Sequence, residues 1–218
     1  MKLMIVGASG HGKVIADIAE KCGYKDIAFL DDDQNKKTCL NYPVIGKTED
    51  AKKYAGADFI VAIGNPEIRE KVQDLLIQEG LHITTLIHPE AVVAGNVSIG
   101  KGTVVMAGAV INPDTAIGDG CIVNTGSTID HDNTLADYVH VSVGSHLAGT
   151  VSVGKYSWIG AGATISNNVS VCASCMIGAG AVVIRDITEP GTYIGIPAKK
   201  VEEQNEMDNL NAKNRMGG

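Results

Sequence analysis

The chain has 218 residues, of which 44% are hydrophobic and 20% charged, as in an ordinary protein of one or two domains. The net charge of -7 and the lack of a basic patch argue against a nucleic-acid partner or an anionic membrane surface. No run of about 18 apolar residues and no signal peptide are found, and the odd number of cysteines suits reduced thiols. We therefore expect a cytoplasmic protein.

Residues 1–82 predict an α/β nucleotide-binding domain. A short apolar strand over residues 2–6 is followed by the glycine-rich sequence GASGHG and by a helical pattern. A second strand over residues 27–30 ends in three aspartates. A third strand over residues 59–63 precedes a helix expected over residues 68–79, with Ile68, Val72 and Leu75/Leu76 on its apolar face.

The glycine loop and the aspartates form a candidate nucleotide site. Glycines let the backbone approach a phosphate, and Gly10 and His11 lie where the following helix offers free N–H groups. Asp31 or Asp32 is placed to accept hydrogen bonds from a ribose or a base. The NAD fingerprint requires glycine where this chain has Ser9, so the pattern favours a nucleotide or nucleotide sugar over NAD. A structural turn without a ligand is the remaining alternative.

A six-residue repeat governs residues 83–201. Every sixth residue from Val93 to Val183 is Val, Ile or Leu, a period that fits neither a helix nor a long two-residue alternation. It fits short strands separated by tight corners, the hexapeptide signature of a parallel β-helix with three hexads per coil. Coils should stack at about 4.8 Å. Residues 202–218 form a polar tail outside the repeat.

These motifs resemble one family. GASGHG, FLDD at residues 29–32, AIGN at residues 62–65 and the repeat containing Asp130-His131-Asp132 are similar to the bacterial sugar O/N-acyltransferases. That group includes UDP-bacillosamine-pathway N-acetyltransferases and sialic-acid O-acetyltransferases. The resemblance runs to about Val201 and implies a Rossmann-like α/β domain followed by a left-handed β-helix. It also implies acetyl-CoA as acyl donor, a homotrimer with active sites between subunits, and a role in bacterial surface glycan or glycoprotein sugar biosynthesis.

Acetyl transfer requires removal of a proton from the acceptor, for which a histidine of near-neutral pKa is suited. His131 lies two residues beyond the inward-facing Ile129, so it should point outward from a corner of the β-helix. The resemblance implies that His131 is the general base and that Asp132 orients it, at a position where Glu is commoner. It also places Asn124 and His140 in the acceptor pocket.

The remaining site residues follow from the resemblance as well. It places His11 near the sugar nucleotide, and Asn65 is a further candidate substrate contact. The pantetheine arm of CoA is expected to lie along backbone near Gly144, Gly162 and Gly180, and Lys199 is placed to meet CoA phosphates. The expected acceptor is a nucleotide-linked 4-amino-dideoxy sugar, with a UDP-linked sugar favoured. No metal is expected.

Three alternatives stay open. O-acetylation of a sialic acid or another sugar uses the same histidine base. A metal hydratase with a β-helix would use histidines such as His131, His140 and His146, but that class lacks the glycine-loop domain. A non-catalytic sugar-nucleotide-binding protein is the third. Cys172 and Cys175 form a CxxC without a second CxxC, so we expect no metal or redox role.

Overall fold

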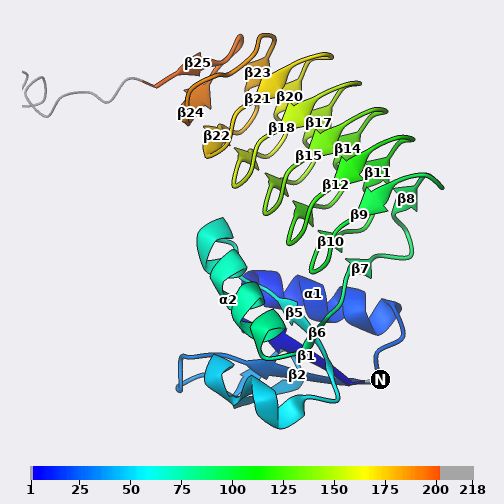
Figure 1. The fold of residues 1–218 in the computed structure, drawn as a ribbon, viewed down its shortest axis with the longest axis vertical. Helices are drawn as coiled ribbons and strands as arrows, with labels where there is room; N and C mark the ends of the chain where they lie inside the picture. The colour runs from blue at the N-terminus through cyan, green and yellow to red at the C-terminus, as the bar shows by residue number, and fades with distance from the viewer. Residues whose placement is uncertain (1, 202–218) are drawn as a thin grey trace, which may run out of the picture.

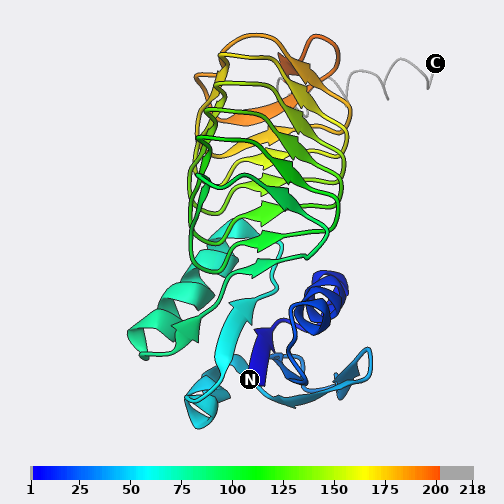
Figure 2. The same ribbon diagram turned by 90° about the vertical axis from the view of Figure 1, so that its right-hand side faces the viewer.

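The computed structural model describes residues 2–201, which form an α/β domain at one end of a parallel β-helix (Figures 1 and 2). The sheet of the α/β domain has the strand order β3-β4-β2-β1-β5-β6. Its strands are β1 (Lys2–Val6), β2 (Asp26–Leu30), β3 (Thr38–Cys39), β4 (Tyr42–Gly46), β5 (Asp58–Val61) and β6 (His82–Ile83). Its helical segments are α1 (Gly10–Lys21), the 3-10 segment η1 (Thr48–Tyr54) and α2 (Pro66–Gln78).

Buried apolar strands and a glycine turn build this domain. β1 lies in the centre of the sheet, parallel to β2 and β5, and its residues after Lys2 are buried. The chain then turns at Gly7, whose φ is +110°, a conformation open to glycine at little cost. A Cβ at Gly12 would lie 2.3 Å from the Gly7 carbonyl oxygen, so α1 can start this close to β1 only with glycine there. The predicted strand, glycine turn and helix are confirmed.

The β-helix has three faces, each a parallel sheet of very short strands except for the antiparallel β24–β25 pair at its end. The first face consists of β7 (Leu86–Ile87), β10 (Val104–Val105), β13 (Ile122–Val123), β16 (His140–Val141), β19 (Trp158–Ile159), β22 (Cys175–Ile177), β24 (Gly191–Ile194) and β25 (Lys199–Lys200). The second consists of β8 (Val92–Val93), β11 (Val110–Ile111), β14 (Thr128–Ile129), β17 (His146–Leu147), β20 (Thr164–Ile165) and β23 (Val182–Val183). The third consists of β9 (Ser98–Ile99), β12 (Ala116–Ile117), β15 (Thr134–Leu135), β18 (Ser152–Val153) and β21 (Ser170–Val171).

The strand register confirms the six-residue repeat. Up to β22 and β23, each strand of the β-helix pairs with the strand 18 residues further on, so that Val105, Val123, Val141 and Ile159 form one inward row. These side chains are fully buried and join one apolar core that runs along the β-helix. Burial of aliphatic groups against aliphatic groups one coil away is the main stabilising term of this domain.

The α/β domain is docked onto the first coils of the β-helix through both helices. α1 packs on the first face, where the outward side chains Leu86, Val104 and Ile122 are buried with Ile15 and Ala19 in one cluster. α2 lies against the corner between the third and first faces (Figure 1). The two domains therefore share a continuous apolar contact.

The predicted apolar face of α2 is partly wrong. Ile68 and Leu75 are exposed, whereas Arg69, Gln73 and Leu76 are buried. The buried polar pair is stabilised because Arg69 and Gln73 donate hydrogen bonds to backbone carbonyl groups of the β-helix corner. Hydrophobic periodicity cannot predict such a contact, since the buried side chains are polar.

Candidate active site

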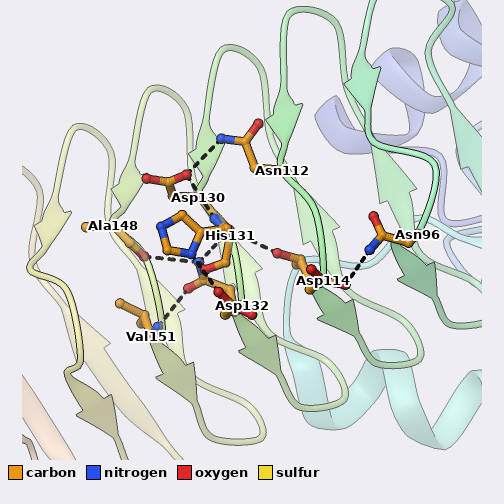
Figure 3. A network of polar contacts seen from close by, with 10 residues as sticks. Asn96, Asn112, Asp114, Asp130, His131, Asp132, Ala148 and Val151 are labelled. Carbon is orange, nitrogen blue, oxygen red and sulfur yellow. Dashed lines mark hydrogen bonds and ion pairs between the residues drawn. The ribbon is translucent and has the colours of Figure 1, made fainter.

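His131 lies at the corner that links the second face to the third, directly after β14 (Figure 3). Its backbone N–H donates to Asp130 Oδ1 at 2.9 Å, and the Asn112 amide donates to the same oxygen at 2.8 Å. These two hydrogen bonds hold the pKa of Asp130 below its usual value, and the bond from Asn112 has the larger effect. Asp130 is thus an ionised cap for the corner that carries His131.

Asp132 contacts the ring of His131 from the same corner. The His131 Nδ1 to Asp132 Oδ2 distance is 2.7 Å, and the ring side chain is 56% exposed. A carboxylate only accepts hydrogen bonds, so Nδ1 carries the proton and Nε2 keeps its lone pair. The bond to Asp132 raises the pKa of His131 above its ordinary value. The corner therefore presents an exposed imidazole whose Nε2 can accept a proton.

A second polar cluster lies on the first face, where the α/β domain meets the β-helix. His140 points outward from β16, and its ring lies 4.4 Å from that of Trp158 in the next coil. Asn124, at the corner after β13, has its Nδ2 3.2 Å from His140 Nε2. His11, in the first turn of α1, has a buried Nε2 without a hydrogen-bond partner among residues 2–201.

His140 is held as a neutral imidazole with one unused donor. The Thr125 N–H donates to Asn124 Oδ1 at 2.8 Å, which leaves the Asn124 NH₂ facing His140 Nε2. Nε2 therefore accepts, and Nδ1 bears a hydrogen that finds no acceptor within residues 2–201. Burial, and then the charge of Arg69, lower the pKa of His140 to about 3 and that of His11 to about 4. This cluster suits a hydrogen-bonding role rather than proton transfer.

Candidate residues of the α/β domain mostly have structural partners. Asp31 Oδ2 accepts from the Ala8 N–H at 2.7 Å and from Lys36 at 3.0 Å. Burial acts to raise the pKa of Asp31, but these bonds outweigh it and keep the pKa low. Asn65 Oδ1 caps α2 by accepting from the Ile68 N–H at 2.9 Å.

Asp32 and Gly10 remain open to a ligand. Asp32 lines a cavity of about 950 Å³ between η1 and α2, together with Thr48 and the exposed Ile68. Its Oδ1 also accepts from the Thr48 N–H at 2.9 Å. Gly10 is exposed at the start of α1, and nothing lies within 4 Å of the position a Cβ would take. The carboxylate of Asp32 thus lines this cavity together with those of Glu49, Glu67, Glu70 and Asp74.

The candidate CoA residues lie along one edge and at one end of the β-helix. Gly144, Gly162 and Gly180 occupy one corner position in successive coils, with φ between +61° and +67° and open space where a Cβ would lie. Their left-handed conformation explains glycine without a ligand. It also leaves a smooth backbone surface along that edge, which fits an extended pantetheine arm. Lys199 lines a cavity of about 510 Å³ beside Arg185 at the end of the β-helix.

Two residues of the second cluster were not found from sequence. Trp158 follows His140 by 18 residues in the outward row of the first face, which reads Leu86, Val104, Ile122, His140, Trp158. Large side chains in an outward row could have indicated a covered face. Arg69 carried no signal, because its burial depends on the docking of the two domains.

The histidines of the metal-hydratase alternative, which would hold zinc across a trimer interface, lie apart within one chain. His131 lies at the corner between second and third faces, His140 on the first face and His146 on the second, where its Nδ1 is 2.9 Å from Thr128 Oγ1. Within residues 2–201, no three or more His, Cys, Asp or Glu side chains are grouped to hold a metal ion. Cys172 and Cys175 are free thiols with sulfurs 3.4 Å apart.

Comparison with known proteins identifies relatives of this fold. Residues 2–76 match the family described as PglD N-terminal domain, and residues 96–131 match the bacterial transferase hexapeptide family. UDP-N-acetylbacillosamine N-acetyltransferase of Bacillus subtilis (strain 168) is 38% identical over 108 residues, 47% of this chain and 50% of that protein. The alignments span about half the length of the curated relatives that the chain matches.

Solved structures match over nearly the whole chain. The acetyltransferase domain of PglB from Neisseria gonorrhoeae FA1090, in complex with acetyl coenzyme A, is 41% identical with a TM-score of 0.89. The match covers 92% of this chain and 98% of that domain. PerB from Caulobacter crescentus, in complex with CoA and GDP-perosamine, is 36% identical with a TM-score of 0.89, over 93% of this chain and 98% of that one.

A Rossmann-like domain followed by a left-handed hexapeptide β-helix defines the class of β-helical acyltransferases. The predicted fold class is confirmed. Within that class, the chain belongs to the bacterial sugar acetyltransferase family with a PglD-type N-terminal domain.

Proposed function

We propose that this protein transfers the acetyl group of acetyl-CoA to the amino group of a nucleotide-linked 4-amino-dideoxy sugar. The observation that carries the proposal is the ring of His131, which is exposed, oriented through Nδ1 by Asp132 and free at Nε2. The related structures are complexes with acetyl coenzyme A and with CoA and GDP-perosamine. The expected location is cytoplasmic, and no helix in residues 2–201 is long and apolar enough to cross a membrane.

In the proposed reaction the sugar amine attacks the thioester carbonyl carbon, and the C–S bond breaks to release the CoA thiol. Nε2 of His131 takes the proton that the amine loses, and Asp132 stabilises the imidazolium that forms. The free Nδ1–H of His140 is a neutral donor suited to a carbonyl or hydroxyl oxygen of a bound substrate. Asp32 and the open glycine turn at Gly10 are the proposed contacts of the nucleotide.

We also propose a homotrimer in which each active site is formed by two subunits. The His131 and His140 clusters lie on different sides of the β-helix of one subunit, since β14 belongs to the second face and β16 to the first. A cyclic, head-to-tail contact would bring the His131 corner of one subunit against the first face of its neighbour. The glycine edge at Gly144, Gly162 and Gly180 and the end near Lys199 would hold the CoA arm and phosphates.

The test of the function is release of CoA thiol from acetyl-CoA with a panel of UDP-, GDP-, dTDP- and CMP-linked sugars that carry an amine or only hydroxyl groups. We expect turnover with an amino sugar and none with its hydroxyl counterpart. Turnover with hydroxyl acceptors alone would instead establish O-acetylation. Binding without thiol release from any acceptor would leave a non-catalytic protein.

His131→Ala tests the proposed base. We expect a loss of about 10²–10⁴ in kcat, the range typical of a missing general base. Binding of acetyl-CoA, measured by calorimetry, should change little because the exposed ring makes no contact with the glycine edge. Near wild-type turnover of this variant would show that another group takes the proton.

A further inference from the structure

The ring of His131 rests on the backbone of the next coil. Residue 149 follows residue 131 by one coil, and it is glycine. A Cβ at Gly149 would lie 2.7 Å from both Cε1 and Nε2 of His131, and 3.3 Å from Nδ1. Carbon atoms do not approach a ring this closely, so any side chain at residue 149 would displace the imidazole.

The fold itself does not require this glycine. Gly149 is absent from the residues with positive φ, so an L-residue could adopt its backbone conformation. The column of equivalent corner positions reads Gly95, Pro113, His131, Gly149 and Asn167, and it therefore accepts side chains of several shapes. What distinguishes Gly149 is the imidazole stacked above it.

The same corner is fixed from inside the β-helix by Asn133. This side chain is fully buried, and its Nδ2 lies 2.6 Å from the Asp130 carbonyl oxygen, 3.2 Å from that of His131 and 3.0 Å from that of Ala148. Its Oδ1 accepts from the Val151 N–H at 3.2 Å. Figure 3 shows four of the residues whose backbone groups Asn133 contacts, Asp130, His131, Ala148 and Val151, around the corner.

Asn133 stands out in its own row. The equivalent inward positions between residues 91 and 187 hold small, hydroxyl or aliphatic side chains, and Asn133 is the single amide. Hydroxyl members such as Ser145 bond the carbonyl groups three residues earlier and one coil later. The longer amide of Asn133 also reaches the carbonyl of His131, so it fixes the peptide group between the histidine and Asp132.

We infer that Gly149 and Asn133 are positioning residues for the His131 base, Gly149 by leaving the space in which the ring lies and Asn133 by fixing the peptide that carries it. The inference rests on the proposed function of His131. Together with the bond to Asp132, these contacts define both the plane of the ring and the direction of Nε2. A catalytic group misplaced by about 1 Å can lower the rate about 100-fold, so the position of the imidazole ring matters for turnover.

Gly149→Ala is the decisive variant, and Gly95→Ala is its matched control. Gly95 occupies the same corner position three coils before Gly149, and nothing lies within 4 Å of its Cβ position. The exposed ring can swing into solvent, so Gly149→Ala should unfold at the same temperature as the control. We expect its kcat to fall by about 10- to 100-fold with an unchanged KM for acetyl-CoA.

Titration of His131 by NMR gives a readout that does not depend on turnover. Its imidazole signal is assigned as the one missing from His131→Ala. In the wild type and in Gly95→Ala the pKa should stand above 6.5, because the ring contacts Asp132. In Gly149→Ala the displaced ring should titrate closer to the ordinary histidine value.

Asn133→Ser separates the two positioning residues. Serine is common in this row and can keep the bonds to the Asp130 and Ala148 carbonyl groups, but it cannot reach that of His131 as well. We expect a several-fold loss of kcat with a small change in unfolding temperature. Asn133→Ala, which keeps none of these bonds, should lose more of both.

The outcomes distinguish the inference from the function on which it rests. If His131→Ala is inactive while Gly149→Ala titrates and turns over like Gly95→Ala, the base stands and the positioning role is overturned. If Gly149→Ala raises only the KM for acetyl-CoA, Gly149 serves donor binding and the inference is also overturned. If His131→Ala stays active, the proposed base is overturned, and the NMR titration alone decides whether Gly149 fixes the ring.

Discussion

Asp132 shows how a single residue can serve both the fold and the site. Its φ is +57°, and the equivalent corner residues Asp114, Thr150 and Asn168 are also left-handed. Aspartate is among the residues that tolerate this conformation, so the β-helix corner favours it without any reference to catalysis. The same corner brings the short carboxylate within 2.7 Å of His131 Nδ1. Asp132 therefore contacts the His131 ring in this structure, although its side chain is shorter than that of the commoner Glu.

Asp132→Asn should move the pH profile of the reaction. The carboxylate raises the pKa of His131, and the neutral ring is the active form, so kcat/KM should rise with pH through a pKa above 6.5. Loss of the negative charge should shift this acidic limb to lower pH and reduce the plateau about tenfold or more. Asp114→Asn, one coil earlier in the same column and bonded to Asn96, is the control. An unshifted limb would remove Asp132 from the mechanism.

His11 and His140 predict a loss of stability in mild acid. Their folded pKa values of about 4 and about 3 lie below the unfolded value of 6.5, so the unfolded chain takes up protons first as the pH falls. The contribution of the two neutral histidines to stability is complete above about pH 6.5. It is lost as the pH falls toward the folded pKa values. Between pH 7 and pH 5 we expect the free energy of unfolding to fall by about 1–2 kcal/mol for each of these histidines. The free energy of unfolding, measured with urea, should depend less on pH in His140→Gln than in His146→Gln. Equal pH dependence in the two variants would contradict this assignment.

At the scale of elements, periodicity predicted most of the fold and docking decided the rest. The inward aliphatic row identified the β-helix, and the outward position of His131 followed from its distance to Ile129. The burial of His140 could not be predicted, because it arises when α1 and α2 cover the first coils. The substrate roles of the α/β residues remain predictions, and Asp31 and Asn65 have structural partners that account for them.

Arg69 is the main polar link between the domains. Its guanidinium donates to the carbonyl groups of Gly120 and Tyr138 in the β-helix and of Ile63 and Gly64 before α2. It is 1% exposed, and burial lowers its pKa to about 10, so it stays charged at neutral pH. A second contact joins Glu70 of α2 to Lys155 at 2.6 Å and to the hydroxyl of Tyr156. α2 is therefore held to the corner by side chains that contact four successive coils.

Arg69→Met should loosen this attachment. It leaves two buried and two partly buried carbonyl groups without this donor, which we expect to cost about 2–4 kcal/mol in the free energy of unfolding. The acceptor KM should rise more than the acetyl-CoA KM, because the proposed acceptor site involves both domains. Ile77→Met, at an exposed position of the same helix outside the cavity lined by Asp32, is the control. Equal changes in the two KM values would show that Arg69 stabilises the chain without shaping the acceptor site.

At the scale of the whole molecule, the surface of the β-helix suggests that a single chain is incomplete. Exposed apolar side chains lie along the β-helix, from Ile87 and Val92 in its first coils to Val143, Met176, Ile184, Ile194 and Ile196 further on. Apolar surface of this kind is commonly covered by a partner. Ile129 and Val141 are twelve residues apart, two hexads of the repeat, and their strands β14 and β16 belong to different faces.

The proposed trimer is tested by mass and by complementation. Light scattering should give three times the chain mass of 22.7 kDa. His131→Ala and His140→Ala homotrimers should each be inactive or severely impaired. When the two proteins are dissociated, mixed and reassembled, some interfaces pair an intact His131 corner with an intact His140 face, so part of the activity should return. A mixture of His131→Ala with Asp132→Asn, which damages the same corner in both chains, should recover nothing. A fully active monomer would end the trimer proposal, whereas a trimer without complementation would show that both clusters act within one chain.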